Sequence, residues 1–256
     1  MLTALALGVC AATGVWAWRM RRRAEVVERR LARATQDLEA LEHAFTKFAP
    51  HEVVERIIAD GVATTGETKE VTILFADLLG FTSLAETMEA TALVALLNAH
   101  FERMAQAVAA HRGHLAKFIG DGLLALFGAL EPNPWQTNDA LHAALAMRAA
   151  LSAHNLELRA RGQAPLAMGI GIHRGPVVAG VLGTSGVREY GVLGHVVNLA
   201  SRVEDLTRVH GVDVLVTDAV RAHCDPRFRL RALPAVDVKG LPEPVVTFAV
   251  DGFDAS

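Results

Sequence analysis

Two aspartates stand where apolar segments of the chain end. Asp77 follows the β-branched and aromatic run from Val71 to Ala76 in "EVTILFADLLGFTSLAE". Asp121 lies in "FIGDG", between the apolar segments "HLAKFIG" and "GLLALFG". Aspartate is common in a glycine turn because it tolerates the turn backbone and hydrogen-bonds its own neighbours, so a turn role alone is one interpretation. The flanking segments are too apolar for a one-faced surface ribbon, which predicts a turn at the edge of a buried sheet.

A helix start follows Asp77 almost at once. Thr82 or Ser83 can cap this helix, with Glu86 completing a capping box. The amides of Gly80, Phe81 and Thr82 therefore stand where helix-terminal N–H groups can hold phosphate oxygens. Carboxylates, a main-chain carbonyl and polyphosphate oxygens are the hard ligands that Mg²⁺ prefers, so an acid beside a phosphate site indicates a bridging metal.

The order of predicted elements gives the fold class. The helix after Gly80 keeps an apolar face through Leu93, Leu97, Phe101, Met104 and Val108. The hairpin around Asp121, a second helix ending near Arg161, and "APLAMGIGIHRGPVVAGVLG" follow, the last read as two strands joined by a Gly-Pro turn. Strand, helix, two strands, helix and strand form the ferredoxin-like βαββαβ arrangement of an α+β domain. Its first strand lies beside the hairpin, so Asp77 and Asp121 are predicted on neighbouring strands, close enough to share cations.

Composition limits the remaining possibilities. A chain of 256 residues with 52% hydrophobic residues can bury one substantial core and carry an appendage. A net charge of -3 argues against a nucleic-acid partner, which usually requires a basic face. The two cysteines, Cys10 and Cys224, form neither a disulfide framework nor a zinc site.

The N-terminal region has its own pattern. Residues 1–18 carry no charge, end in two tryptophans and precede "RMRRR", which predicts a transmembrane helix that just spans a hydrocarbon layer of about 30 Å. The arginines after it predict that the rest of the chain lies in the cytoplasm. The expected localisation is therefore the inner cell membrane. A cleaved or interfacial segment is the alternative.

Residues 19–48 are predicted to form a juxtamembrane coiled coil. Apolar residues recur at alternating spacings of three and four, at Ala24, Val27, Leu31, Ala34, Leu38, Leu41, Phe45 and Phe48. Packing of this stripe on the chain's own globular domain is the alternative. Two anchored, zipped chains would form a symmetric homodimer. Residues 49–69 then form a linker helix and loop, and residues 70–251 the globular domain.

Four ordered segments of the globular domain resemble a known family. "VTILFADLLGFTSL", "KFIGDGLLALFG", "GIGIHRGPVVAGVLG" and "YGVLGHVVNLASRVE" look like successive signature segments of the class III nucleotidyl cyclases. The resemblance implies conversion of a nucleoside triphosphate to a 3′,5′-cyclic monophosphate and pyrophosphate. It also implies a homodimer with two active sites formed across the interface.

The resemblance assigns roles residue by residue. Asp77 and Asp121 would be ligands of two Mg²⁺ or Mn²⁺ ions, with the Leu78 carbonyl assisting. From the opposite subunit, Asn198 and Arg202 would orient the ribose and neutralise charge developing on the α-phosphate. The lysine of "VKG", Lys239, matches the family's triphosphate-binding lysine.

Two further positions concern the base. Lys117 matches a lysine associated with adenine, because an ammonium donates to the unprotonated ring N1. The second selective position, usually Asp or Thr in the family, falls on Gly191, and His195 stands where Asp or Asn is commoner. We therefore expect ATP as the substrate of an adenylate cyclase, with weakened discrimination against GTP. A guanylate or dual-specificity cyclase and a catalytically degenerate dimerisation or sensor module are the alternatives.

Overall fold

The protein is described by a computed structural model that covers residues 66–183, 188–237 and 244–254. The predicted transmembrane helix, the predicted coiled coil and residues 49–65 of the predicted linker lie outside these residues. Across the described residues, no helix is both long and apolar enough to cross a membrane.

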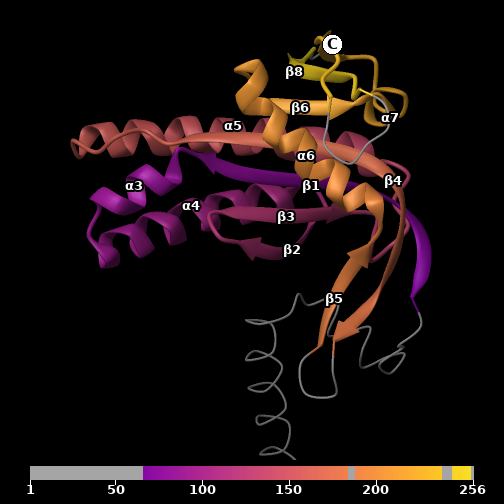
Figure 1. Cartoon of the computed structure of the whole chain (residues 1–256), viewed down its shortest axis with the longest axis horizontal. Coiled ribbons are helices and arrows are strands. Elements are labelled where there is room, and N and C mark those ends of the chain that lie inside the picture. The colour runs from indigo at the N-terminus through magenta and orange to yellow at the C-terminus, as the bar shows by residue number, and fades with distance from the viewer. Residues whose placement is uncertain (1–65, 184–187, 238–243, 255–256) are drawn as a thin grey trace, which may run out of the picture. The chain divides into compact units, whose positions relative to one another are not determined.

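One mixed sheet organises the domain (Figure 1). Its strands run in the order β2-β3-β1-β4-β6-β8-β7, and β5 pairs with β4. The strands are β1 (Glu67–Leu79), β2 (His114–Ile119), β3 (Gly122–Phe127), β4 (Ala167–Gly183), β5 (Arg188–Leu193), β6 (Val214–Thr217), β7 (Phe228–Ala232) and β8 (Thr247–Phe253). The helices are α3 (Phe81–Thr87), α4 (Ala90–Ala110), α5 (Gln136–Ala160), α6 (His195–His210) and α7 (Asp218–Arg221). Because β1 pairs antiparallel with β3 and β4, the predicted ferredoxin-like core is confirmed.

Alternation along β1 divides the core into two layers. Leu74, Ala76 and Leu78 pack in the cluster that contains the buried side chains of α4 and α5. Val71 and Ile73 pack in a second cluster with Val196 and Ala200 of α6. Since side chains alternate across a strand, odd-numbered β1 residues face α6. Figure 1 shows this helix across the strands, with α4 on the other side.

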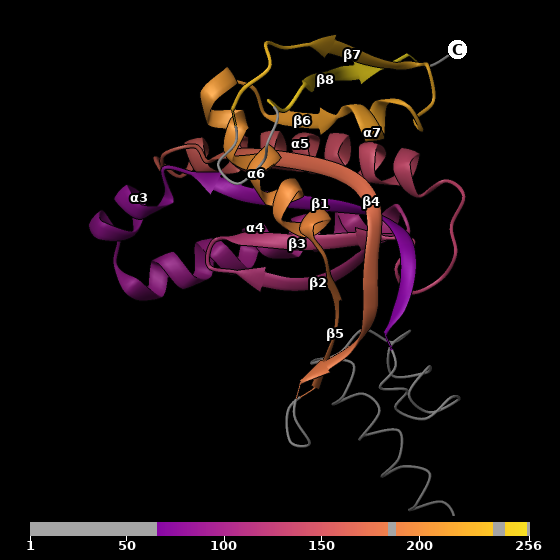
Figure 2. The ribbon, with the colours of Figure 1, turned by 45° about the vertical axis from the view of Figure 1, so that its right-hand side comes forward.

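The predicted Gly-Pro turn is wrong, because residues 167–183 form a single long strand, β4. Its register with β1 runs without a break from Ala167 to Ala179, through Pro176 opposite Glu70. Between Ile172, the last residue paired with β6, and Val178, the first paired with β5, β4 has a strand on only one side. Proline is tolerated at such edge positions. Beyond it, β4 and β5 extend together as a two-stranded arm (Figure 2).

The predicted helix after Gly80 is divided into α3 and α4, with Met88 extended between them. The predicted capping box is wrong: Gly80 itself is the N-cap of α3, in a left-handed conformation (φ 76°), and no side chain caps this helix. Instead, the carboxylate of Glu89 accepts a bond from the amide of Ala92 and caps α4. Of the first two described helices, α4 alone therefore has a side chain that satisfies one of its free N-terminal N–H groups.

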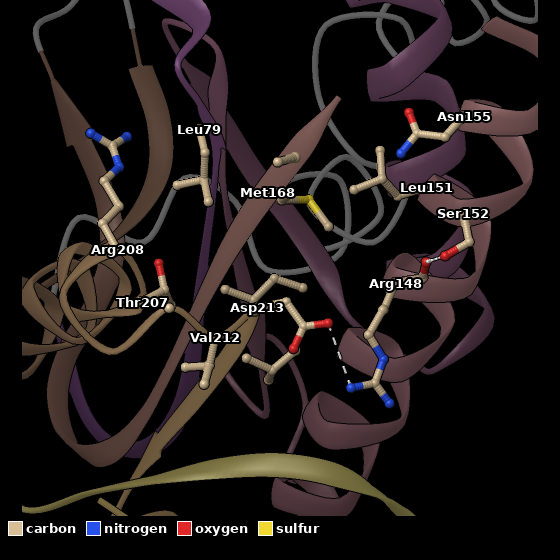
Figure 3. A pocket seen from close by; sticks show the side chains of 14 residues that line it. Leu79, Arg148, Leu151, Ser152, Asn155, Met168, Thr207, Arg208, Val212 and Asp213 are labelled. Carbon is tan, nitrogen blue, oxygen red and sulfur yellow. Dashed lines mark hydrogen bonds and ion pairs between the residues drawn. The ribbon is translucent and has the colours of Figure 1, made fainter. Parts of the chain in front are cut away.

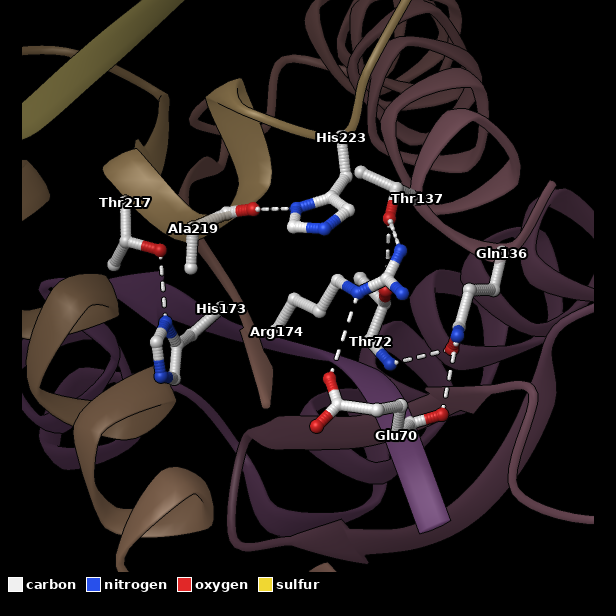
Figure 4. A network of polar contacts seen from close by, with 9 residues as sticks. All are labelled: Glu70, Thr72, Gln136, Thr137, His173, Arg174, Thr217, Ala219 and His223. Carbon is white, nitrogen blue, oxygen red and sulfur yellow. Dashed lines mark hydrogen bonds and ion pairs between the residues drawn. The ribbon is translucent and has the colours of Figure 1, made fainter. Parts of the chain in front are cut away.

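A polar cluster fixes the start of α5 against β1 (Figure 4). Gln136 accepts from the Thr72 amide at 2.9 Å and donates to the Glu70 carbonyl at 3.1 Å. Arg174 donates to the Thr137 hydroxyl at 3.0 Å and lies 3.7 Å from the Glu70 carboxylate. We call these five residues the α5 cluster. The hydrogen bonds of Gln136 satisfy the buried Thr72 amide and the Glu70 carbonyl, whereas Arg174 Nε has no hydrogen-bond partner among the described residues.

Candidate active site

The two predicted aspartates meet at one end of the sheet. Asp77 belongs to the odd-numbered side of β1 and faces α6, while Asp121 lies in the β2–β3 turn beside Gly120, whose φ of 63° favours glycine. Burial raises the pKa of Asp77, and the side chain of Asp121 lies close enough to Asp77 for its negative charge to raise this pKa further. A Cβ on Gly122 would stand 2.8 Å from Asp77 Oδ1 and from the Ala76 carbonyl oxygen, so the glycine lets the turn close on Asp77.

Asp77 is electrostatically perturbed. Burial, with the neighbouring negative charge of Asp121 as the second cause, raises the pKa of Asp77 to about 6. The guanidinium of Arg208, whose Nη2 lies 3.3 Å from Asp77 Oδ2, acts in the opposite direction. A second positive charge at this position would stabilise the ionised pair further.

The pair fits a hard divalent cation, because two adjacent carboxyl groups offer the oxygen ligands that Mg²⁺ and Mn²⁺ bind. The described residues contain no group of three or more His, Cys, Asp or Glu side chains able to hold a metal. A cation at Asp77 and Asp121 would therefore need oxygen ligands from main-chain carbonyls, water or substrate phosphates. Leu78, whose carbonyl was predicted to assist, is a buried residue directly after Asp77 in β1.

Two charged residues of α6 join this site, and the sequence analysis did not identify them. Gly169 of β4 pairs with Asp77, and a Cβ on Gly169 would lie 2.8 Å from Glu204 Oε1. Gly171 similarly leaves room for the α6 backbone at Glu204. The spacing offered a signal: Val196, Ala200 and Glu204 follow one another at four-residue intervals on the apolar side of α6. A glutamate in such a stripe is predicted to be buried.

Glu204 is 6% exposed, and its Oε1 has no hydrogen-bond partner among the described residues. Burial, followed by the negative charges of Asp77 and Asp205, raises the pKa of Glu204 to about 7. Arg208 lowers it. Carboxyl groups whose pKa values are raised by burial and by neighbouring negative charges are typical of functional sites.

The predicted ribose and phosphate residues, Asn198 and Arg202, are exposed on α6. Arg202 lies 3.4 Å from the Asp205 carboxylate, and within the described part of the chain neither Arg202 nor Asn198 forms a hydrogen bond or ion pair with Asp77 or Asp121. One chain therefore does not bring these predicted residues together with the aspartates.

The remaining predicted residues are distributed over other elements. Lys117 is exposed on β2, beside a register shift. Gly191 is buried on β5 opposite Gly180, where a Cβ would stand 3.1 Å from Leu182 Cδ1. Gly80, Phe81 and Thr82 occupy the predicted helix start after β1. Lys239 lies outside the described residues.

A pocket of about 570 Å³ lies between α5, β4 and the end of α6 (Figure 3). Leu79 and Arg208 line it, but Asp77 and Asp121 do not. Its other polar groups already have partners, because Arg148 pairs with Asp213 and donates to the Val250 carbonyl, and Asn155 bonds the Leu166 backbone. The pocket is therefore distinct from the carboxylate pair.

The fold and the paired aspartates define a nucleotidyl cyclase domain, and the chain belongs to the family described as adenylate and guanylate cyclase catalytic domain, which matches residues 63–252. An adenylate cyclase of Anabaena cylindrica is 34% identical over 218 residues, which cover 81% of this chain and 42% of that protein. The chain thus spans about two-fifths of this curated relative.

Two solved structures are similar in fold. The guanylyl cyclase Cya2 is 34% identical with a TM-score of 0.70, over 74% of this chain and 95% of that one. The adenylyl cyclase CyaB from P. aeruginosa is 28% identical with a TM-score of 0.69, over 74% and 97%. Because a guanylyl and an adenylyl cyclase match with nearly equal TM-scores, similarity of fold does not select the base.

Proposed function

We propose that the protein is a homodimeric adenylate cyclase that converts ATP to 3′,5′-cyclic AMP and pyrophosphate. The observation that carries the proposal is the Asp77–Asp121 pair at the sheet end of a cyclase-family domain. In this reaction the ribose 3′-oxygen bonds to the α-phosphorus, the bond to the β-phosphate oxygen breaks, and the 3′-hydroxyl proton is released. Two Mg²⁺ or Mn²⁺ ions at the pair would lower the pKa of the 3′-hydroxyl and neutralise the triphosphate.

The chain's own residues would position the substrate. Asp77 and Asp121 hold the cations, with the Leu78 carbonyl assisting, and amides from Gly80 to Thr82 face the phosphates. Asn198 orients the ribose, while Arg202 stabilises negative charge developing on the α-phosphate. Lys239 binds the terminal phosphates.

Composite active sites follow from the placement of these residues. Asn198 and Arg202 are exposed four residues apart on α6, whereas Glu204 and Arg208 of the same helix face their own chain's Asp77. The first pair is thus available to a second copy of the domain. We propose that each site takes its aspartates from one subunit and Asn198 and Arg202 from the other.

Complementation tests the composite sites. Asp77→Ala and Arg202→Ala subunits should each be inactive alone, yet co-expression should restore about a quarter of wild-type activity. Random pairing makes half of the dimers heterodimers, and each heterodimer has one intact site of two. Cyclic nucleotide formation is measured after verifying heterodimers with two affinity tags. Verified heterodimers without activity would contradict shared sites.

Adenine selection rests on Lys117. An ammonium on the exposed face of β2 can donate to adenine N1, but guanine presents an N–H there. Gly191 supplies no side chain to read the 6-amino group, so the expected selectivity is modest. A guanylate or dual-specificity cyclase is the second candidate, favoured by the similarity to Cya2. A degenerate module is disfavoured by the intact aspartate pair.

Competition between the two nucleotides tests the substrate. Purified full-length chain is incubated with equimolar ATP and GTP and Mn²⁺, and the products are separated by chromatography. We expect predominantly cyclic AMP, and a shift towards cyclic GMP in Lys117→Glu. Predominant cyclic GMP from the wild-type protein would replace the proposal by its guanylate alternative, and no cyclic product would favour the degenerate module.

We further propose that residues 1–18 anchor the protein in the inner cell membrane and that residues 19–48 form a coiled coil. The uncharged segment followed by arginines, and the heptad spacing, support these proposals. Together they would keep two catalytic domains in the cytoplasm at a high effective concentration.

A further inference from the structure

Arg208 binds the same carboxylate that is assigned to the metal. Its Nη2 donates to Asp77 Oδ2 at 3.3 Å, and the arginine side chain is 52% exposed. A partly exposed ion pair of this kind contributes little to folding stability. Its chemical consequence is larger, because a guanidinium on one oxygen of Asp77 and a divalent cation compete for the same negative charge.

Glu204 offers Arg208 a second acceptor. The two residues stand four apart on α6, with the glutamate N-terminal to the arginine, which is the favourable order for an ion pair on a helix. Glu204 Oε1 has no hydrogen-bond partner among the described residues although the residue is only 6% exposed. It lies beside Gly169, the residue paired with Asp77 across the β1–β4 ladder. A buried acceptor without a donor is therefore within one helical turn of Arg208.

We propose that Arg208 competes with the divalent cation for Asp77, and that Glu204 accepts the Arg208 guanidinium when the cation holds Asp77. Both act as positioning residues, and the inference rests on the metal role of Asp77 in the proposed function. A cation on Asp77 repels the like charge of Arg208. Moving to Glu204 gives that arginine a carboxylate partner and gives the glutamate a donor, so that neither charge is left alone beside the metal.

The experiment measures Mn²⁺ binding directly. Electron paramagnetic resonance reports free Mn²⁺ in titrations of the full-length chain at pH 8 without nucleotide, so catalysis is not involved. Arg208→Gln removes the competing cation and should tighten Mn²⁺ binding by about three- to tenfold, whereas Arg208→Lys should stay close to wild type. Glu204→Gln removes the alternative acceptor and should weaken binding by about two- to fivefold.

A double variant tests whether Glu204 acts through Arg208. In the Arg208→Gln background the Glu204→Gln change should have much less effect, because the arginine that it receives is gone. Arg231→Gln is the matched control, since Arg231 is also a half-exposed arginine paired with an aspartate, Asp251, far along the chain. It should leave Mn²⁺ affinity unchanged, and circular dichroism confirms folding of every variant.

The outcomes separate this inference from the proposed function. Unchanged Mn²⁺ affinity in Arg208→Gln overturns the competition, and an undiminished Glu204→Gln effect in the double variant overturns the acceptor role. Loss of Mn²⁺ binding in Asp77→Asn together with an unchanged Arg208→Gln would overturn only the inference. Unaltered binding in both Asp77→Asn and Asp121→Asn would instead overturn the metal site of the proposed function.

Discussion

Two polar clusters touch the same strand, β1. The α5 cluster is held by hydrogen bonds, whereas the Asp77 cluster, formed by Asp77, Asp121, Glu204 and Arg208, brings carboxyl groups together. In the α5 cluster the Gln136 amide bonds both the Thr72 amide and the Glu70 carbonyl. At Asp77, five residues along β1, a carboxyl pKa is raised to about 6 and the neighbouring Glu204 Oε1 has no donor among the described residues. Hydrogen bonds from a side chain to the backbone fix structure, whereas carboxyl groups with raised pKa values are typical of functional sites.

The largest expected effect lies at the Asp77 cluster. Asp77→Ala or Asp121→Ala should reduce cyclic nucleotide formation by about 10³-fold or more, because each removes a carboxylate that we propose as a ligand of the metals. Folding should be retained, since the change relieves a repulsive carboxyl pair. Activity at saturating Mn²⁺ and circular dichroism are measured together, and substantial turnover in either variant would refute the role of the pair.

The opposite result is expected at the α5 cluster. Gln136→Ala leaves the buried Thr72 amide without its acceptor and should lower the free energy of unfolding by about 1–3 kcal/mol. Urea denaturation measures this loss. Specific activity per folded molecule should change little, because Gln136 lies on α5, away from both aspartates. A variant that keeps its stability but loses activity would contradict the structural role of the α5 cluster.

Local patterns in the sequence predicted the core of the fold and the aspartate pair. The alternation of strands and helices indicates the βαββαβ order, and that topology alone brings Asp77 beside the turn of Asp121. The predicted Gly-Pro turn was wrong because proline is tolerated in a strand that has a neighbour on only one side. Which strands pair is decided by the tertiary structure and is not visible in the local sequence.

Arg208 and Glu204 show what local patterns leave out. Arg208 is an ordinary exposed helix arginine by sequence, and its proximity to Asp77, 131 residues away, arises only from how closely α6 packs on Gly169 and Gly171. The apolar spacing of α6 predicts that Glu204 is buried, but it does not predict that Glu204 Oε1 has no hydrogen-bond donor among the described residues. Likewise, one chain cannot show where Asn198 and Arg202 meet a substrate if a second subunit completes the site.

The smallest effect concerns how pH acts on the Asp77 cluster. Burial raises the pKa of Glu204 to about 7 in the folded state, above its ordinary value of 4.5, so the folded state binds more protons than the unfolded chain between these values. The stability that Glu204 contributes is thus present below pH 4.5 and is lost as pH rises through 7.

Glu204→Gln removes this dependence. Relative to wild type, its free energy of unfolding should increase by about 1–2 kcal/mol between pH 5 and pH 8. An ideal shift would give roughly 2.7 kcal/mol, because the slope is about 1.36 kcal/mol per pH unit over the two units from pH 5 to the folded pKa of about 7. Comparing variant with wild type cancels the opposite trend of His100 and His173, whose pKa values burial lowers to about 4. Glu102→Gln, on the exposed side of α4, controls for the loss of one carboxylate. Urea denaturation at both pH values measures the difference in free energy of unfolding between Glu204→Gln and wild type. If this difference is the same at pH 5 and pH 8, Glu204 ionises as readily as an exposed glutamate. That result would remove the distinction between the two clusters.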